Sequence, residues 1–393
     1  METLSENSEN ITYVTTVKKF LKGEINRELG TTVDIQEDYK IQKYICDLVV
    51  FRGGDIIYIF TIKSPSYIKL KENYLRKELQ RLSNSPEATT AKIYFAYLDE
   101  SGKLVTVQYT AKIKSQNSEN SPQPTYAKSF SEFYSKLKEI CKESYDIQFF
   151  FRGQSNHEYE QKPSIYRNDF IKYEDNMYYE AIRQNPAEFT NDMSTFDKLV
   201  KMQHYELPTR LLDITTNPLV ALYFACKGNE NKDGVVLIFA MDEKQIKNFD
   251  SDSVCILSNL AKCPNDFSFD RNKGKFIYDI QQDKPKFNGE YLSIDAIQKV
   301  VCVKPKLNND RIIRQNGAFF IYGIGDTKEE RAQLIDAPIK IMIKSEYKKD
   351  ILKELQTLGI EEASLFPETD KIMNKIKSAY SRETTSSNAL LFI

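Results

Sequence analysis

Apolar and polar positions in the first part of the chain follow a pattern that predicts mixed helices and strands. A helical spacing of apolar residues covers 12–29, and two apolar runs, 44–51 and 56–63, lie on either side of Gly53-Gly54. Two such runs joined by a Gly-Gly pair predict a β-hairpin. The further elements expected here are a helix over 66–82, a strand over 92–98 and a strand near 104–112. The predicted order is α-β-β-α-β.

The second part of the chain is longer and more mixed. The helices predicted there cover 130–141, 172–185, 194–205, 345–358 and 367–379, and the strands cover 147–151, 234–240, 317–323 and 338–344. Ser194, with Asp197 three residues later, resembles a capping box at a helix start. The run LVALYFAC after Asn217-Pro218 is apolar on every side and ends at Gly228. We therefore expect a buried helix there.

A polar stretch, KSQNSENSPQPT at 114–125, separates the two parts and has no hydrophobic period. It predicts an exposed linker. The expected domains are therefore 10–113 and 126–380, followed by a C-terminal tail over 381–393. The expected fold class is α/β (α+β).

Composition limits the function. The 55 Lys and Arg residues nearly balance the 56 Asp and Glu residues, so the net charge of −1 provides no overall attraction for nucleic acid. No apolar run is long enough to span a bilayer, and the polar start METLSENSENITY is unlike a signal peptide, so we expect a cytoplasmic protein without a membrane partner. With two histidines, His157 and His204, and six scattered cysteines, no metal site is expected. The oligomeric state is left open.

Asp47 near the end of one predicted strand, the Gly-Gly turn, and Lys63 at the end of the next resemble the core of the PD-(D/E)xK nuclease superfamily. That resemblance implies a restriction-endonuclease-like domain with Mg²⁺ held by acidic side chains. Thr61 stands where the family has an acid, and the remaining acidic candidates are Glu24, Glu72 and Glu78. Three interpretations stay open: an unrelated α/β module, an inactive nuclease-like domain that binds nucleic acid, and an active nuclease.

The second part carries a more specific set of motifs. They are FRGQ at 151–154, QHYELPTRLLD at 203–213, TTNPLVALYFA at 215–225, RIIRQNGAFF at 311–320 and SLFP at 364–367. Together they resemble the FRG domain family over about 130–380. Two departures are Glu206, where the family usually has Gly, and Ile214, where it usually has Trp.

The residues of these motifs suggest a site. Arg152 leaves a strand into Gly153, where a guanidinium can bind a phosphate or carboxylate. A titratable ring, a hydroxyl, a cation and a carboxylate follow within ten residues: His204, Thr209, Arg210 and Asp213. We expect Arg152, His204, Arg210 and Asp213 to converge in one pocket. The structural alternative is that Arg210 pairs with Asp213 or Asp197, His204 caps a helix and Thr209 bonds to the backbone.

The order of the motifs is similar to that of ADP-ribosyltransferases, and this resemblance implies a possible ADP-ribosyltransferase-like fold with NAD as cofactor. By it, Arg152, Gly153, Gln154 and Thr209 bind the cofactor and Gln315 occupies the third catalytic position, where those enzymes have Glu. The FRG domain is thereby expected to bind, and in its active form to cleave, NAD or a related nucleotide. Coupled to a nuclease-like sensing domain, it resembles a bacterial toxin or phage-defence effector. The alternatives are a non-catalytic nucleotide or nucleic-acid binding module and a metal-dependent nuclease.

Overall fold

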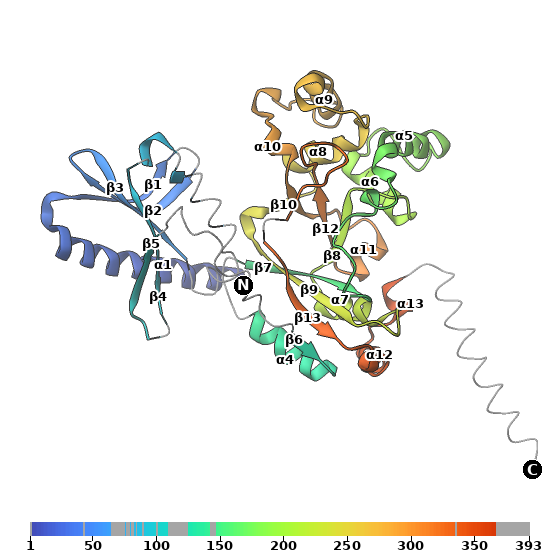
Figure 1. Ribbon diagram of the computed structural model, residues 1–393, viewed down its shortest axis with the longest axis horizontal. Helices are drawn as coiled ribbons and strands as arrows, with labels where there is room; N and C mark the ends of the chain where they lie inside the picture. Colours follow the sequence, from blue (N-terminus) through green and yellow to red (C-terminus); the bar gives the residue numbers. More distant parts are fainter. Residues whose placement is uncertain are drawn as a thin grey trace, which may run out of the picture. The chain divides into compact units, whose positions relative to one another are not determined.

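The computed structural model describes residues 2–41, 44–63, 75, 79, 82–83, 85–88, 90–99, 101–108, 125–141, 147–334 and 336–366. The chain divides into two compact units, one formed by Met1–Gln123 with Cys141–Ile147 and the other by Pro124–Ile140 with Gln148–Ile393 (Figure 1). Each is built on a sheet, and the fold is mixed α+β. The expected linker 114–125 and tail 381–393 lie outside the described residues, apart from Thr125.

The first unit contains a five-stranded sheet in the order β1-β2-β3-β4-β5. The strands are β1 (Asp34–Ile41), β2 (Tyr44–Arg52), β3 (Asp55–Ile62), β4 (Lys92–Leu98) and β5 (Leu104–Gln108). Neighbours are antiparallel except β3 and β4, which are parallel. The predicted hairpin is confirmed at Gly53 and Gly54, which both have positive φ. Strand β1 was not predicted.

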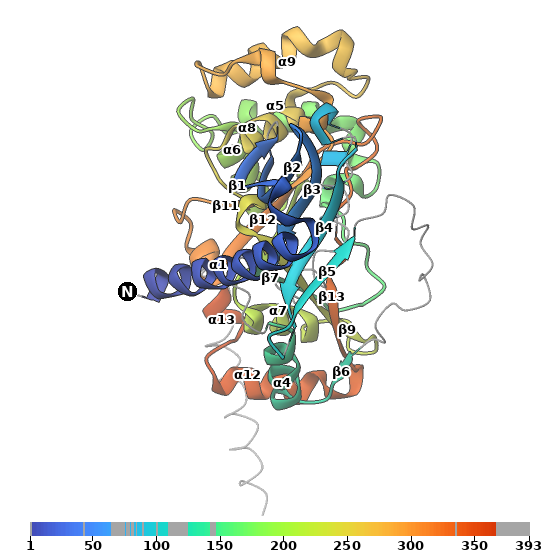
Figure 2. The same ribbon diagram turned by 90° about the vertical axis from the view of Figure 1, so that its left-hand side faces the viewer.

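Helix α1 (Glu2–Leu29) runs across one face of this sheet (Figure 2). Its Val17, Leu21 and Ile25 pack against apolar side chains of β2, β3 and β4. The opposite face is covered in part by Leu79 and Leu82, which are buried. These two leucines belong to the helix expected over 66–82, most of which lies outside the described residues.

The second unit contains an eight-stranded sheet in the order β10-β11-β12-β8-β7-β9-β13-β6. Its strands are β6 (Thr125–Ala127), β7 (Ile147–Gln154), β8 (Leu211–Thr215), β9 (Gly234–Asp242), β10 (Ile246–Asn248), β11 (Val300–Lys304), β12 (Gly317–Tyr322) and β13 (Ile339–Ile343). Pairs β10–β11 and β13–β6 are parallel. Strands β7 and β8 are registered through a single pair, Phe151 with Thr215, so the sheet opens at its middle.

Ten α-helices are described in this unit. They are α4 (Phe130–Ile140), α5 (Glu174–Gln184), α6 (Thr195–His204), α7 (Pro218–Cys226), α8 (Asp252–Asn259), α9 (Phe269–Asp283), α10 (Ile294–Ile297), α11 (Asp310–Arg314), α12 (Lys348–Thr357) and α13 (Glu362–Leu365). Among the helices described in both units, none is long and apolar enough to cross a bilayer. The helix expected over 367–379 lies outside the described residues.

Helix α7 lies almost in contact with the sheet backbone, and its predicted burial is confirmed. A Cβ on Gly153 would lie 1.8 Å from the carbonyl oxygen of Ala221, and one on Gly234 would lie 2.1 Å from that of Ala225. Glycines on β7 and β9 therefore allow this close approach.

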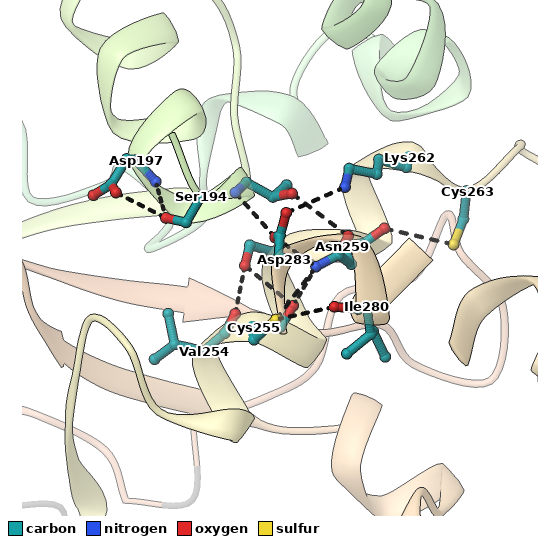
Figure 3. A network of polar contacts seen from close by, with 11 residues as sticks. Ser194, Asp197, Val254, Cys255, Asn259, Lys262, Cys263, Ile280 and Asp283 are labelled. Carbon is teal, nitrogen blue, oxygen red and sulfur yellow. Dashed lines mark hydrogen bonds and ion pairs between the residues drawn. The ribbon is translucent and has the colours of Figure 1, made fainter. Parts of the chain in front are cut away.

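Helices α8 to α10, which the sequence pattern did not predict, form an apolar layer beside α6. A buried polar network ties this layer to the start of α6 (Figure 3). One oxygen of Asp283 accepts hydrogen bonds from the Thr195 amide and from Asn259 Nδ2, each at 3.0 Å. Ser194 caps α6 as predicted, accepting from the Asp197 amide. The position of α6 is thus fixed at its N-terminal end.

Lys348, at the start of α12, connects two loops of the same unit. Its buried ammonium donates to the carbonyl oxygens of Ser155 at 2.7 Å, Asn229 at 3.1 Å and Gly228 at 3.3 Å. Ser155 follows β7, and the other two residues follow α7. One cation therefore holds the exit of β7 against the end of α7.

Candidate functional site

A cavity of about 310 Å³ lies where β7 and β8 separate, and residues of α6, α7 and α11 line it. Figure 1 labels these strands and helices. Apolar side chains from five of the surrounding elements line it: Val200, Ile214, Val220, Phe224, Ile312 and Phe319. The polar side chains in the lining are also numerous and are chemically diverse: Arg152, Gln203, His204, Asp213, Thr215, Asn309, Arg311 and Gln315. A cavity that combines apolar surface with convergent polar groups is typical of a small-molecule site.

Arg152 lies at the opening between the strands. Its Nη1 donates to the main-chain carbonyl oxygen of Asp213 at 2.5 Å, beside the single β7–β8 pair. Its Nε is buried and has no hydrogen-bond partner among the described residues. Burial lowers the pKa of Arg152, and the nearby Asp213 carboxylate opposes that effect. Because an arginine keeps its charge, this half-buried group presents a cation to an anionic ligand in the cavity.

The Asp213 carboxylate is exposed, and one of its oxygens accepts a hydrogen bond from a neighbouring side chain. Gln203 Nε2 donates to Asp213 Oδ1 at 2.8 Å, and Gln203 Oε1 accepts from the hydroxyl of Thr209 at 2.6 Å. Gln203 lies in the last turn of α6, and Thr209 is buried just before β8. Gln203 lies in the motif at 203–213 but was not predicted as a site residue, because its side chain is neutral and does not titrate.

Two further polar residues enter the cavity as expected from the sequence. His204 occupies the last position of α6 and lines the cavity beside Gln203. Gln315 also lines the cavity, and its Nε2 donates to the carbonyl oxygen of Leu365 at 3.1 Å. The Gln315 carbonyl accepts from Thr215 at 2.6 Å. Gln315 therefore also attaches α13 to the rim.

Arg311 brings a second guanidinium into the lining and was not singled out from the sequence. Its Cζ lies 4.8 Å from the ring centroid of Phe366, which is a cation–π distance. Phe366 also meets Phe224 edge to face, with centroids 6.0 Å apart. The chain just after α13 therefore supports Arg311. Its place in the motif at 311–320 could have indicated it.

Comparison with known families bears on the part of the chain that contributes Arg152, Gln203 and Asp213. Residues 147–234 match the family model of the FRG domain. The chain carries an FRG domain. No curated protein and no solved structure matches the chain. Arg311 and Gln315 lie outside the matched segment, so the cavity extends beyond the residues that the family model covers.

One of the predicted catalytic residues, Arg210, lies outside the cavity. Arg210 is fully buried and pairs with both oxygens of Glu174, while its Nη1 donates to the Tyr322 carbonyl at 2.8 Å. Lys328 Nζ lies 3.3 Å from the same carboxylate. The expectation that Arg210 joins Arg152 in one pocket is wrong, and so is its alternative pairing with Asp213 or Asp197. The Arg210 guanidinium points into the interior, where the buried Glu174 carboxylate balances its positive charge.

The residues expected to bind a cofactor divide into two groups. Arg152 and Gly153 line the cavity. Among the described lining residues, neither Gln154 nor Thr209 is found, and both side chains are buried. Thr209 reaches the cavity through Gln203. The backbone at Gly153 closely approaches helix α7.

The acidic position in the first unit has a structural partner. Asp47 Oδ2 accepts from the Ile62 amide at 2.8 Å, which ties β2 to β3, and burial raises the pKa of Asp47. Glu24 is exposed on α1, while Glu72 and Glu78 lie outside the described residues. Among the described residues of the chain, no group of three or more His, Cys, Asp or Glu side chains is arranged to hold a metal ion.

Proposed function

We propose that the cavity of the FRG domain binds NAD or a related nucleotide, with Arg152 on its phosphates. The observation that carries this proposal is the half-buried guanidinium of Arg152 at the wall of a cavity of about 310 Å³, with an Nε that lacks a partner among the described residues. Arg311 supplies a second cation in the same lining, and Phe224 and Phe319 supply aromatic surface for a base. Guanidinium groups bind phosphates in two-point contacts.

The same cavity supports a reaction class. Asp213 is the carboxylate in the lining, and it can stabilise the positive charge that develops on a ribose as nicotinamide leaves. In that step the ribose–nitrogen bond breaks, its electron pair leaves with nicotinamide, and water adds to the ribose carbon with release of a proton. Gln315 is uncharged, and its amide is engaged with Leu365. Asp213 therefore takes the role for which the motif order suggested Gln315.

In this proposal the protein is a cytoplasmic toxin or phage-defence effector. The FRG domain acts on the nucleotide, and the first unit senses a nucleic acid. The support for the sensing role is the resemblance of the Asp47–Lys63 hairpin to nuclease cores together with the acid missing at Thr61. The FRG role rests on the cavity alone.

Calorimetry of the full chain with NAD, ADP-ribose and ATP tests the binding step. Arg152→Ala removes a charge-assisted contact, so the best ligand should bind about tenfold to a hundredfold more weakly. Arg183→Ala is the matched control, because Arg183 is exposed and pairs with Glu180 on α5. No binding at millimolar ligand, or equal affinities for wild type and Arg152→Ala, would overturn the proposal.

A further inference from the structure

Thr209, Gln203 and Asp213 form a hydrogen-bond relay whose direction is set by the backbone. The Leu211 amide donates to Thr209 Oγ1 at 3.2 Å. An amide N–H can only donate, so the Thr209 hydroxyl must direct its own proton to another acceptor. That acceptor is Gln203 Oε1, 2.6 Å away.

This arrangement determines which way the Gln203 amide is turned. With its oxygen on Thr209, its NH₂ group faces Asp213 and donates to Oδ1 at 2.8 Å. The reverse orientation would place an amide oxygen against a carboxylate oxygen, which leaves two acceptors facing each other. One carboxylate oxygen is therefore held by a donor of fixed orientation at the wall of the cavity.

The main chain of Asp213 makes a separate hydrogen bond, to Arg152. The Asp213 carbonyl accepts from Arg152 Nη1 at 2.5 Å, so the main chain of Asp213 is joined to the guanidinium while its side chain is joined to Gln203. A ligand with its phosphate on Arg152 would have an acceptor-only group nearby. The part of a nucleotide that supplies paired hydroxyl donors is the ribose.

We propose that Asp213 recognises the hydroxyls of a ribose, that Thr209 and Gln203 are positioning residues for its carboxylate, and that the site therefore selects ribonucleotides over deoxyribonucleotides. This inference rests on the proposed nucleotide binding. It differs from that proposal in naming the sugar contact and in assigning a buried threonine a role in specificity.

The test uses the full chain and NAD together with two analogues, each lacking the 2′-hydroxyl of one of the two riboses. In the wild type, at least one analogue should bind about tenfold more weakly than NAD, since a hydrogen bond to a charged group is lost. Asp213→Ala keeps the carbonyl that bonds Arg152, so it should still bind the phosphates while discriminating little between NAD and the analogues.

Thr209 provides the matched pair of variants. Thr209→Val keeps the shape but loses the hydroxyl, so discrimination should fall, while Thr209→Ser keeps the hydroxyl and should retain it. Equal binding of NAD and both analogues to the wild type would overturn the inference, as would full discrimination by Asp213→Ala or by Thr209→Val. Failure of the wild type to bind NAD at all would instead overturn nucleotide binding, and the sugar contact with it.

Discussion

Arg152 Nη1 and the carbonyl oxygen of Asp213 lie 2.5 Å apart and join β7 to β8 where the two strands share only one registered pair. A side chain thus supplies a bond that a sheet normally makes from backbone to backbone. Because the strands separate beside this contact, the cavity opens within the sheet itself, and the guanidinium that closes the seam also faces the cavity.

Gly153→Ala should destabilise the second unit by about 1 to 3 kcal/mol or more, because overpacking forces a backbone shift. The new Cβ would lie 1.8 Å from the Ala221 carbonyl oxygen, and helix backbone cannot move aside as a side chain can. Gly274→Ala in α9 is the control, since nothing lies within 4 Å of its Cβ. That change should stabilise by about 0.5 to 1 kcal/mol. Calorimetric melting of both variants checks the difference, and similar melting temperatures would contradict the close contact with α7.

Glu174→Gln should cost about 3 to 5 kcal/mol, the range for breaking a buried ion pair. The variant leaves Arg210 and Lys328 buried without their shared carboxylate. Glu180→Gln removes an exposed partner of Arg183 and should change stability little, because solvent screens an exposed pair. Urea unfolding monitored on the second unit compares the two. A small effect at Glu174 would mean that Arg210 has another compensating group.

Asp47→Asn should make the first unit more stable at neutral pH. Burial raises the folded-state pKa of Asp47, so the native state binds this proton more tightly than the unfolded chain does. The resulting stabilisation is present below the unfolded pKa and is lost as pH rises through the folded value. Asn cannot ionise, yet its oxygen can still accept from the Ile62 amide. The stability difference between variant and wild type, followed from pH 3 to pH 8, should grow with pH, and a difference that shrinks would show that the ionised form is favoured.

The purified protein should not cleave DNA or RNA in the presence of Mg²⁺. Thr61 provides no charge where the nuclease pattern needs an acid, and Asp47 is bonded to the Ile62 amide. Gel assays with single- and double-stranded substrates check this. Mg²⁺-dependent cleavage that disappears in both Asp47→Ala and Lys63→Ala would show that the first unit is an active nuclease.

Sequence patterning located the elements whose local signal is strong. Gly53-Gly54 marked the hairpin, Ser194 marked the start of α6, and the wholly apolar run in 218–226 marked α7. Strand β1 was missed because DIQEDYKI is mostly polar and sits at the edge of the sheet, where few of its side chains are buried. The helices over 252–297 were missed because short apolar segments there obtain their stability from tertiary packing.

The site was predicted in part for a related reason. Motif spacing identified Arg152, His204, Asp213 and Gln315, all of which line the cavity. Spacing could not show which way a side chain points, so Arg210 was assigned to the site although its partner Glu174 lies 36 residues earlier in the chain. It also gave no weight to Gln203, whose importance depends on its bonds to Thr209 and Asp213.

The ammonium of Lys348 sets a limit on how this protein can be divided. A fragment ending at residue 234, where the FRG match ends, would keep the three carbonyls of Ser155, Gly228 and Asn229 but lose the cation that binds them. It would also lack β12, which pairs with β8, and all of β9 except Gly234. The segment that the FRG family model matches is therefore shorter than the smallest piece able to fold. Any truncated version used in place of the whole chain needs to extend through α12.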